Sequence, residues 1–176
     1  MFILQPHAKA SSMLLRTPQR DDRLWRDELA IRLGTADLPG MIEMEALDDE
    51  PCLDFTVIDG LQFTVCTEAF KDAVDGAALT GIQFAPVRVQ NSAAELPPLY
   101  AMQILGRCGV LQLLDPKAKR GLGRGLMASE YDGTDFATRA DRKGATPLLI
   151  SERTERVLRS FTGMEFVPVK LVDSLP

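Results

Sequence analysis

The stretch that decides the fold is Gly163-Met-Glu-Phe-Val-Pro-Val-Lys-Leu171, because it repeats an earlier stretch, Gly81-Ile-Gln-Phe-Ala-Pro-Val-Arg-Val89. The glycine, the phenylalanine, the proline and the valine that follows the proline are identical in the two stretches. The other pairs are similar in polarity. Further upstream, Thr67-Glu68 aligns with Ser151-Glu152 once two residues are dropped from the segment between. The sequence therefore predicts one supersecondary unit that occurs twice, at residues 61–90 and 146–172.

Each unit begins as a strand that runs into a helix. Thr67 and Ser151 both follow a short apolar run, and their hydroxyl oxygens can accept hydrogen bonds from the free N–H groups of a helix start. Glu68 and Glu152 come next, where a negative charge favours the positive end of the helix dipole. Apolar side chains then recur at spacings of three and four, which predicts one buried helix face per unit: Phe70, Ala73, Val74 and Ala77, and Thr154, Val157, Leu158 and Phe161.

Each unit is expected to end in a second strand. Gly81 and Gly163 are the residues that tolerate a left-handed helix cap. Alternating polarity after each glycine is typical of a half-buried strand. Pro86 and Pro168 have no N–H to give to a ladder, which predicts that both strands lie at a sheet edge or a bulge. We expect Phe84 and Phe166 to occupy equivalent buried positions in the two units.

Two units are too few for a solenoid, which needs about three stacked repeats. The chain has 176 residues, of which 45% are apolar, enough for one sizeable core and short for two domains. The prediction is a single α+β domain over residues 1–176, with a duplicated strand–helix–strand unit and a mainly antiparallel or mixed sheet.

The rest of the chain predicts a helix from Asp21 or Asp22 to Gly34, strands at 42–46 and 53–58, a turn at Asp59-Gly60, strands at 99–105 and 110–114, and mostly loop with a short helix over 115–144. The strands at 99–105 and 110–114 are expected to form a hairpin through Gly106 and Gly109. Trp25 is expected in the core.

The sequence indicates a cytoplasmic protein, because it lacks a signal-peptide pattern and any apolar stretch of the ~20 residues that span a bilayer. Its three cysteines show no C-x-x-C spacing, which favours reduced thiols over disulfides or a zinc site. Cys66 is expected to be buried in the first strand of its unit.

Negative charge is concentrated in one part of the chain. Residues 1–75 carry 15 acidic and 7 basic side chains, against 10 and 13 in residues 76–176. Six acids fall within twelve positions: Glu43, Glu45, Asp48, Asp49, Glu50 and Asp54. This run is either a solvated face or an acidic surface that steers a basic protein partner into contact. Nucleic acid is a poor partner for it, because the phosphates would be repelled.

Catalytic patterns are scarce. The one histidine, His7, lies near a terminus, and the acids lack the regular spacing of a calcium loop. We therefore expect no catalytic residues, no metal site and no cofactor. One motif, Arg120-Gly-Leu-Gly-Arg-Gly125, resembles the pyrophosphate loop of GCN5-type acetyltransferases and makes an acyl-CoA-dependent N-acetyltransferase the alternative function. That family needs a long helix after the glycines, and the sequence there favours a flexible basic loop.

The C-terminal unit carries a second resemblance. An apolar strand, Ser151-Glu152, an amphipathic helix and Thr162-Gly-x-x-Phe-x-Pro-Val169 resemble a family of small bacterial immunity proteins encoded beside polymorphic toxins. Asp135-Phe136, Arg139 and the strand at Leu99-Tyr100 are similar to further elements of that family. The resemblance covers roughly residues 53–176.

The resemblance implies a cytosolic protein that binds and neutralises a cognate toxin without catalysis of its own. The acids at positions 43–54 are then the candidate partner-binding residues, and no membrane or nucleic-acid partner is expected. An uncharacterised protein-binding domain is a further alternative. The identity of the toxin and the oligomeric state stay open at this point.

Overall fold

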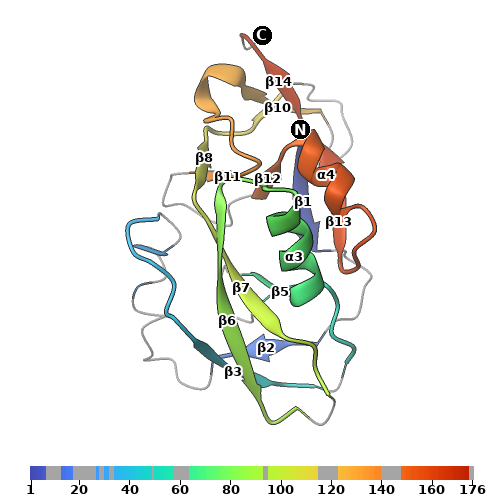
Figure 1. The fold of residues 1–176 in the computed structure, drawn as a ribbon. Coiled ribbons are helices and arrows are strands. Elements are labelled where there is room, and N and C mark those ends of the chain that lie inside the picture. The colour runs from blue at the N-terminus through green and yellow to red at the C-terminus, as the bar shows by residue number, and fades with distance from the viewer. Residues whose placement is uncertain are drawn as a thin grey trace.

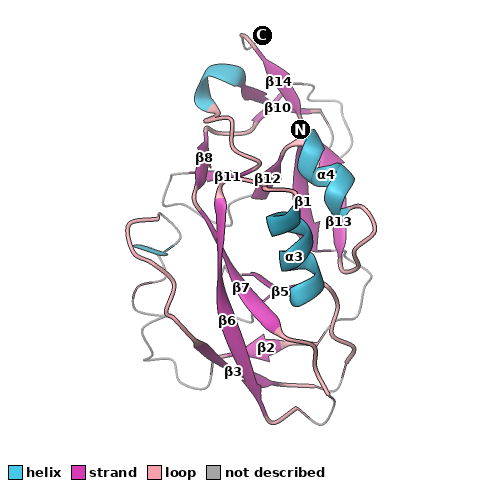
Figure 2. Cartoon of the chain, viewed as in Figure 1, coloured by secondary structure: helices cyan, strands magenta, loops and turns pink. Residues whose placement is uncertain are grey.

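The computed structural model describes residues 1–6, 13–17, 27, 30–31, 34–48, 50–57, 64–92, 95–114, 123–139 and 148–174 (Figures 1 and 2). Within these ranges the strands are β1 (Phe2–Pro6), β2 (Leu15–Arg16), β3 (Ile42–Ala46), β4 (Phe55–Val57), β5 (Thr64–Thr67), β6 (Ile82–Gln90), β7 (Leu99–Ile104), β8 (Gly106–Cys108), β9 (Gln112–Leu113), β10 (Arg124–Met127), β11 (Phe136–Arg139), β12 (Leu148–Ile150), β13 (Met164–Pro168) and β14 (Lys170–Val172). The helices are α3 (Glu68–Gly76), α4 (Glu152–Leu158) and the 3-10 turn η1 (Ala128–Glu130).

The strands form three sheets. One has the order β2-β3-β6-β7-β5-β4, the second β13-β1-β12-β11-β8, and the third β14-β10-β9. Neighbouring strands are antiparallel except in the pairs β3–β6, β8–β11 and β10–β14, which are parallel. The prediction of an α+β fold with mixed sheets is therefore confirmed.

Both helices begin at the predicted caps. The Thr67 hydroxyl accepts a hydrogen bond from the Phe70 N–H, and the Ser151 hydroxyl accepts one from the Thr154 N–H. α3 lies against β5 and β7 and beside α4 (Figure 1). The Phe70 ring meets the Phe161 ring edge-on, with 5.7 Å between their centroids, so the two apolar helix faces share one core.

The two glycines adopt the predicted backbone conformation at a different place. Gly81 has φ +83° and Gly163 has φ +87°, but each lies five residues beyond the last helical residue and therefore caps no helix. They lie at the entrances of β6 and β13. A Cβ atom would overlap the carbonyl oxygen of Phe136 at Gly81 and that of Phe55 at Gly163. Close backbone approach, together with the positive φ, accounts for glycine at both positions.

The prediction for Pro86 is wrong in one respect. Pro168 lies on β13, an edge strand as expected, but β6 has a neighbour on each side. The ladder between β6 and β3 begins at Val87, one residue after Pro86. The missing N–H of Pro86 therefore costs no hydrogen bond, because the strand is still unpaired on that side.

Other expectations need correction. β7 and β9 belong to different sheets and form no hairpin, because Gly106 opens β8, which pairs with β11. Residues 124–127 and 136–139, expected to be mostly loop, are strands, and the expected short helix there is η1.

The predicted strand at 42–46 is confirmed as β3, and that at 53–58 is shorter, as β4. Trp25, His7, the Asp59-Gly60 turn and Arg120 lie outside the described residues.

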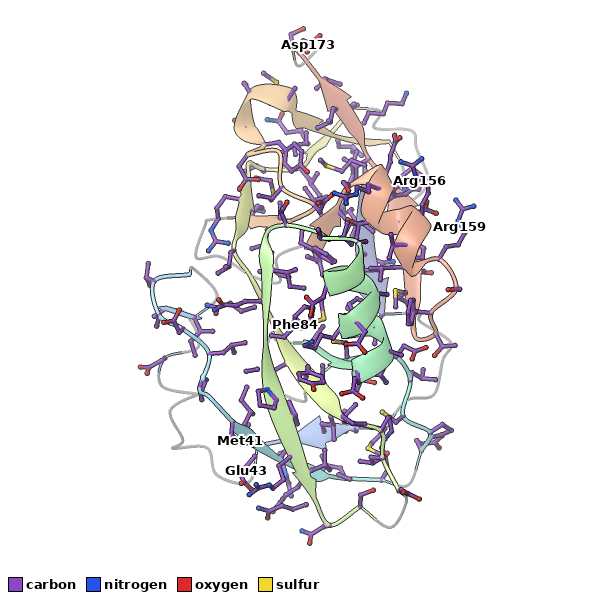
Figure 3. The ribbon with its side chains drawn as sticks, in the orientation of Figure 1. Met41, Glu43, Phe84, Arg156, Arg159 and Asp173 are labelled. Atoms are coloured by element: carbon purple, nitrogen blue, oxygen red, sulfur yellow. The ribbon has the colours of Figure 1, made fainter. Side chains whose placement is uncertain are left out.

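Phe84 and Phe166 are both half-buried rather than buried. They pack against the same core cluster, which contains Phe70 and Phe136. The main contacts of α3 with the sheet are to β5 and β7, and the Phe84 ring on β6 is only partly covered. Figure 3 labels Phe84.

We expect Phe70→Ala to lower the free energy of unfolding by about 3–5 kcal/mol, because the ring is fully buried between Phe55 and Phe161. Phe84→Ala removes a half-exposed ring and should cost clearly less. Urea denaturation of both variants measures the difference. Equal losses would contradict this account of the core.

Candidate functional site

Two of the predicted acids lie side by side on β3. In the register of the sheet, Glu43 is opposite Arg88 and Glu45 is opposite Arg16. The Glu43 Oε1 atom lies 3.2 Å from Arg88 Nη1, and the Glu45 Oε2 atom lies 3.1 Å from Arg16 Nη2. The side-chain amide of Gln90 also donates to Glu43. We call these five residues the paired-charge face.

The paired-charge face looks away from the core. Met44 and Val89 alternate with its residues along β3 and β6, and they pack into the core cluster behind the sheet. The arginines are 51% and 63% exposed. Exposed ion pairs of this kind contribute only about 0–1 kcal/mol to stability, so folding does not explain them.

Exposed apolar side chains lie next to this face. Leu14 precedes β2, Met41 precedes β3 and Leu47 follows β3, and they are 39%, 45% and 38% exposed. Figure 3 shows Met41 close to Glu43, toward the end of the molecule away from Arg156 on α4. We call these three residues the apolar rim.

An open depression lies on the other side of β6, at the loop that joins it to β7. Its volume is about 430 Å³, and it is lined by Val87, Val89, Asn91, Ser92, Leu96, Pro97, Pro98 and Leu99. This lining includes no charged side chain, so the depression offers no group for acid–base chemistry.

The remaining acids of the run serve other ends. Asp48 accepts hydrogen bonds from the backbone N–H groups of Leu14 and Glu50, at 3.2 and 3.3 Å. It thereby joins the segment before β2 to the turn after β3. Asp48 and Glu50 are exposed, and Asp49 lies outside the described residues. The described acids of the run therefore differ in their surroundings.

Asp54 lies just before β4, at the sheet edge opposite β2, and has an internal role. Its carboxylate accepts hydrogen bonds from the Thr67 hydroxyl at 2.9 Å and from the Thr162 N–H and hydroxyl at 2.9 and 2.8 Å. Burial alone raises the pKa of Asp54, but these hydrogen bonds stabilise the charged form and lower the pKa below its usual value.

Asp135 makes a similar set of contacts at the start of α4. It accepts hydrogen bonds from the Ser151 hydroxyl at 2.7 Å and from the Thr80 N–H and hydroxyl at 3.0 and 3.3 Å. Each aspartate thus joins the cap of one helix to the Thr-Gly turn that follows the other helix. We call Asp54 with Thr67 and Thr162, and Asp135 with Ser151 and Thr80, the two aspartate clamps.

The sequence interpretation missed the clamps. It assigned Asp54 to a partner surface because of the neighbouring acids. The available signal was the dipeptide Asp-Phe at Asp54-Phe55 and again at Asp135-Phe136, where the phenylalanine opens a strand each time.

The described residues contain no group of three or more His, Cys, Asp or Glu side chains that could hold a metal ion. Of the acetyltransferase-like motif, Gly125 lies in β10 and is followed by extended chain and the single turn η1. A phosphate-binding loop needs a helix start at this point, and a strand takes its place.

The cysteines are free thiols. Burial, the largest cause, raises the pKa of Cys66 well above its usual value, that of Cys108 to about 11, and also that of Cys52. Thiols in this state are weak nucleophiles at neutral pH, because the thiolate is the reactive form. Cys66 is buried in β5, as predicted.

Comparison with known proteins adds no relative. A scan against protein-family models finds no matching family, and a search of the curated proteins finds no match. Among the helices of the described ranges, none combines the length and apolar character needed to cross a bilayer.

We expect Asp54→Asn to lower the free energy of unfolding by about 1–3 kcal/mol at pH 7, because it removes the charge that three donors stabilise. Since folding lowers the pKa of Asp54, this stabilisation is present above the unfolded value of about 3.9 and is lost as the pH falls through the folded value. Thermal unfolding from pH 7 down to pH 3 measures it.

The matched control is Asp72→Asn on α3, where the side chain is 67% exposed and pairs with Lys71. It should change stability little at any pH. A difference between the Asp54 variant and the unmodified protein that is the same at pH 3 and pH 7 would contradict the charged clamp.

Proposed function

We propose that this chain is an immunity protein, which binds and neutralises a cognate bacterial toxin and carries out no chemistry of its own. The observation that supports it best is the paired-charge face beside the apolar rim. Exposed Met41 and Leu47 next to arginine side chains match the composition of protein–protein contacts, in which methionine and arginine are enriched. The C-terminal motif, which resembles immunity proteins, points in the same direction.

The proposed partner is a protein with a basic surface. The chain has a formal net charge of −5, which attracts such a partner over a distance of about 8 Å at physiological salt. The exposed acids Asp48 and Glu50 add to this attraction beside the rim. Glu43 and Glu45 are already paired with arginines, so they favour a particular orientation of the partner more than they add net charge.

We also propose that the units at 61–90 and 146–172 are copies of one ancestral unit. Three features support this: a hydroxyl cap on each helix, a glycine with positive φ before each second strand, and an aspartate clamp on each cap. The duplicated unit supplies the scaffold, and the paired-charge face belongs to the part of the chain that includes the first copy.

The alternatives differ in what supports them. An uncharacterised protein-binding domain would use the same face, and only the identity of the partner distinguishes it. The N-acetyltransferase alternative has no specific support, because the chain that follows Gly125 is extended.

The test uses the toxin encoded beside this chain, identified by sequencing the neighbouring reading frames. We expect Glu45→Lys with Asp48→Lys to slow association about tenfold at low salt and to flatten its salt dependence, because electrostatic steering is lost. Stopped-flow or surface-based kinetics across a salt series measures the rate.

The matched control is Asp72→Lys with Asp75→Lys, which changes the net charge equally at exposed positions on α3. It should change the rate far less. Equal slowing by both pairs would show a general effect of charge and overturn the proposed face. If this chain neither binds the neighbouring toxin nor protects cells from it, the immunity function is wrong.

A further inference from the structure

We infer that the duplication extends over almost the whole described chain, and that the N-terminal strand β1 is the last strand of the second copy. The first copy comprises β2 to β7 with α3. The second comprises β9 to β14 with α4, and β1 completes it from the other end of the sequence. This inference goes beyond the proposed function and does not depend on it.

The position of β1 in its sheet matches that of β7. β7 lies between β5 and β6, antiparallel to both, and β1 lies between β12 and β13, also antiparallel to both. These flanking strands are the ones that the sequence repeat aligns. β1 thus fills in the second copy the slot that β7 fills in the first.

The match holds residue by residue. Tyr100 of β7 is opposite Pro86 on one side and Cys66 on the other. Phe2 of β1 is opposite Pro168 and Ile150, which are the aligned residues of the second unit. Two residues along each strand, Met102 and Leu4 face the aligned pairs in the same way: Phe84 and Thr64, and Phe166 and Leu148.

The outer strands follow the same pattern. After its proline, β6 acquires the parallel neighbour β3, and the segment after Pro168 acquires the parallel neighbour β10. Arg88 is opposite Glu43 in the first case, and the aligned Lys170 is opposite Gly125 in the second. β2 and β9 then add antiparallel strands outside, and β4 and β11 pair antiparallel with β5 and β12.

The contacts between the copies occur in reciprocal pairs. Asp54 binds Thr162 of the other copy, and Asp135 binds Thr80. Gly81 lies against the Phe136 carbonyl, and Gly163 lies against the Phe55 carbonyl. Contacts that recur with the roles exchanged are the mark of a two-fold axis. Sheets of unrelated origin have no reason to reproduce them.

The order along the chain shows a permutation. Both copies run through four strands, a helix and a further strand in the same order along the chain. The first copy then continues into β7. In the second copy the Val169 N–H donates to the Met1 carbonyl at 2.9 Å, which places β1 directly beside the end of β13.

The test is a circular permutant of the full chain, in which residues 7–176 come first and residues 1–6 follow through a four-residue Gly-Ser linker. In the first copy 11 residues, 88–98, separate the paired residues Val87 and Leu99. Residues 170–176 supply 7, so the linker restores the span of 11 between Val169 and Met1. We expect one cooperative transition with a melting temperature within about 4 °C of the unpermuted chain.

The control permutant carries the same linker but opens between Ala78 and Leu79, which separates α3 from β6 inside one copy. It should lose the cooperative transition. If the first permutant fails to fold, or folds no better than the control, the assignment of β1 to the second copy is overturned.

A second measurement uses the intact chain. Thr80→Val and Thr162→Val each remove one hydroxyl donor from a clamp. Because the two positions are equivalent, both should lower the melting temperature, and by amounts within about a factor of two. A loss confined to one of them would overturn the two-fold relation.

Discussion

The structure depends on two carboxylates at the place where its sheets meet. Asp54 and Asp135 each accept hydrogen bonds from two different segments, and each thereby fixes a helix start against a distant turn. Asp135 is 9% exposed, and taking a carboxylate out of water is unfavourable unless its oxygens are satisfied. Here donors surround them. These hydrogen bonds fix the starts of α3 and α4, whose apolar faces share one aromatic core.

Local signals in the sequence predicted the local structure well. The alternation at Ile42–Ala46 marked β3 to the residue, and the hydroxyls of Thr67 and Ser151 marked the helix starts. β10 and β11 were missed because each has four residues and is held by pairing with distant strands, which no window of sequence contains. Pro86 is a similar case. A proline is tolerated there because the ladder between β6 and β3 begins one residue later, which the sequence alone does not show.

The acidic run shows why spacing along the chain is a weak guide to a surface. An extended chain moves about 3.3 Å per residue and turns alternate side chains to opposite faces. Glu43 and Glu45 therefore share a face of β3, whereas Asp54 lies across the sheet and binds groups of the protein itself. The arginines that pair with the acids come from β2 and β6, which the sequence could not place beside β3.

The placement of β1 bears on how the chain reaches its fold. Phe2 pairs with Ile150 and Pro168, so β1 gains its partners only after the long stretch of chain that separates it from these residues has been synthesised. Pairings of such long sequence separation slow folding, since a large loop must close before any contact rewards it. Until then, the apolar Ile3 and Leu4 are exposed on the growing chain. The nascent chain thus carries an uncovered strand until β12 and β13 have been made, and such a strand is the kind of segment that chaperones shield.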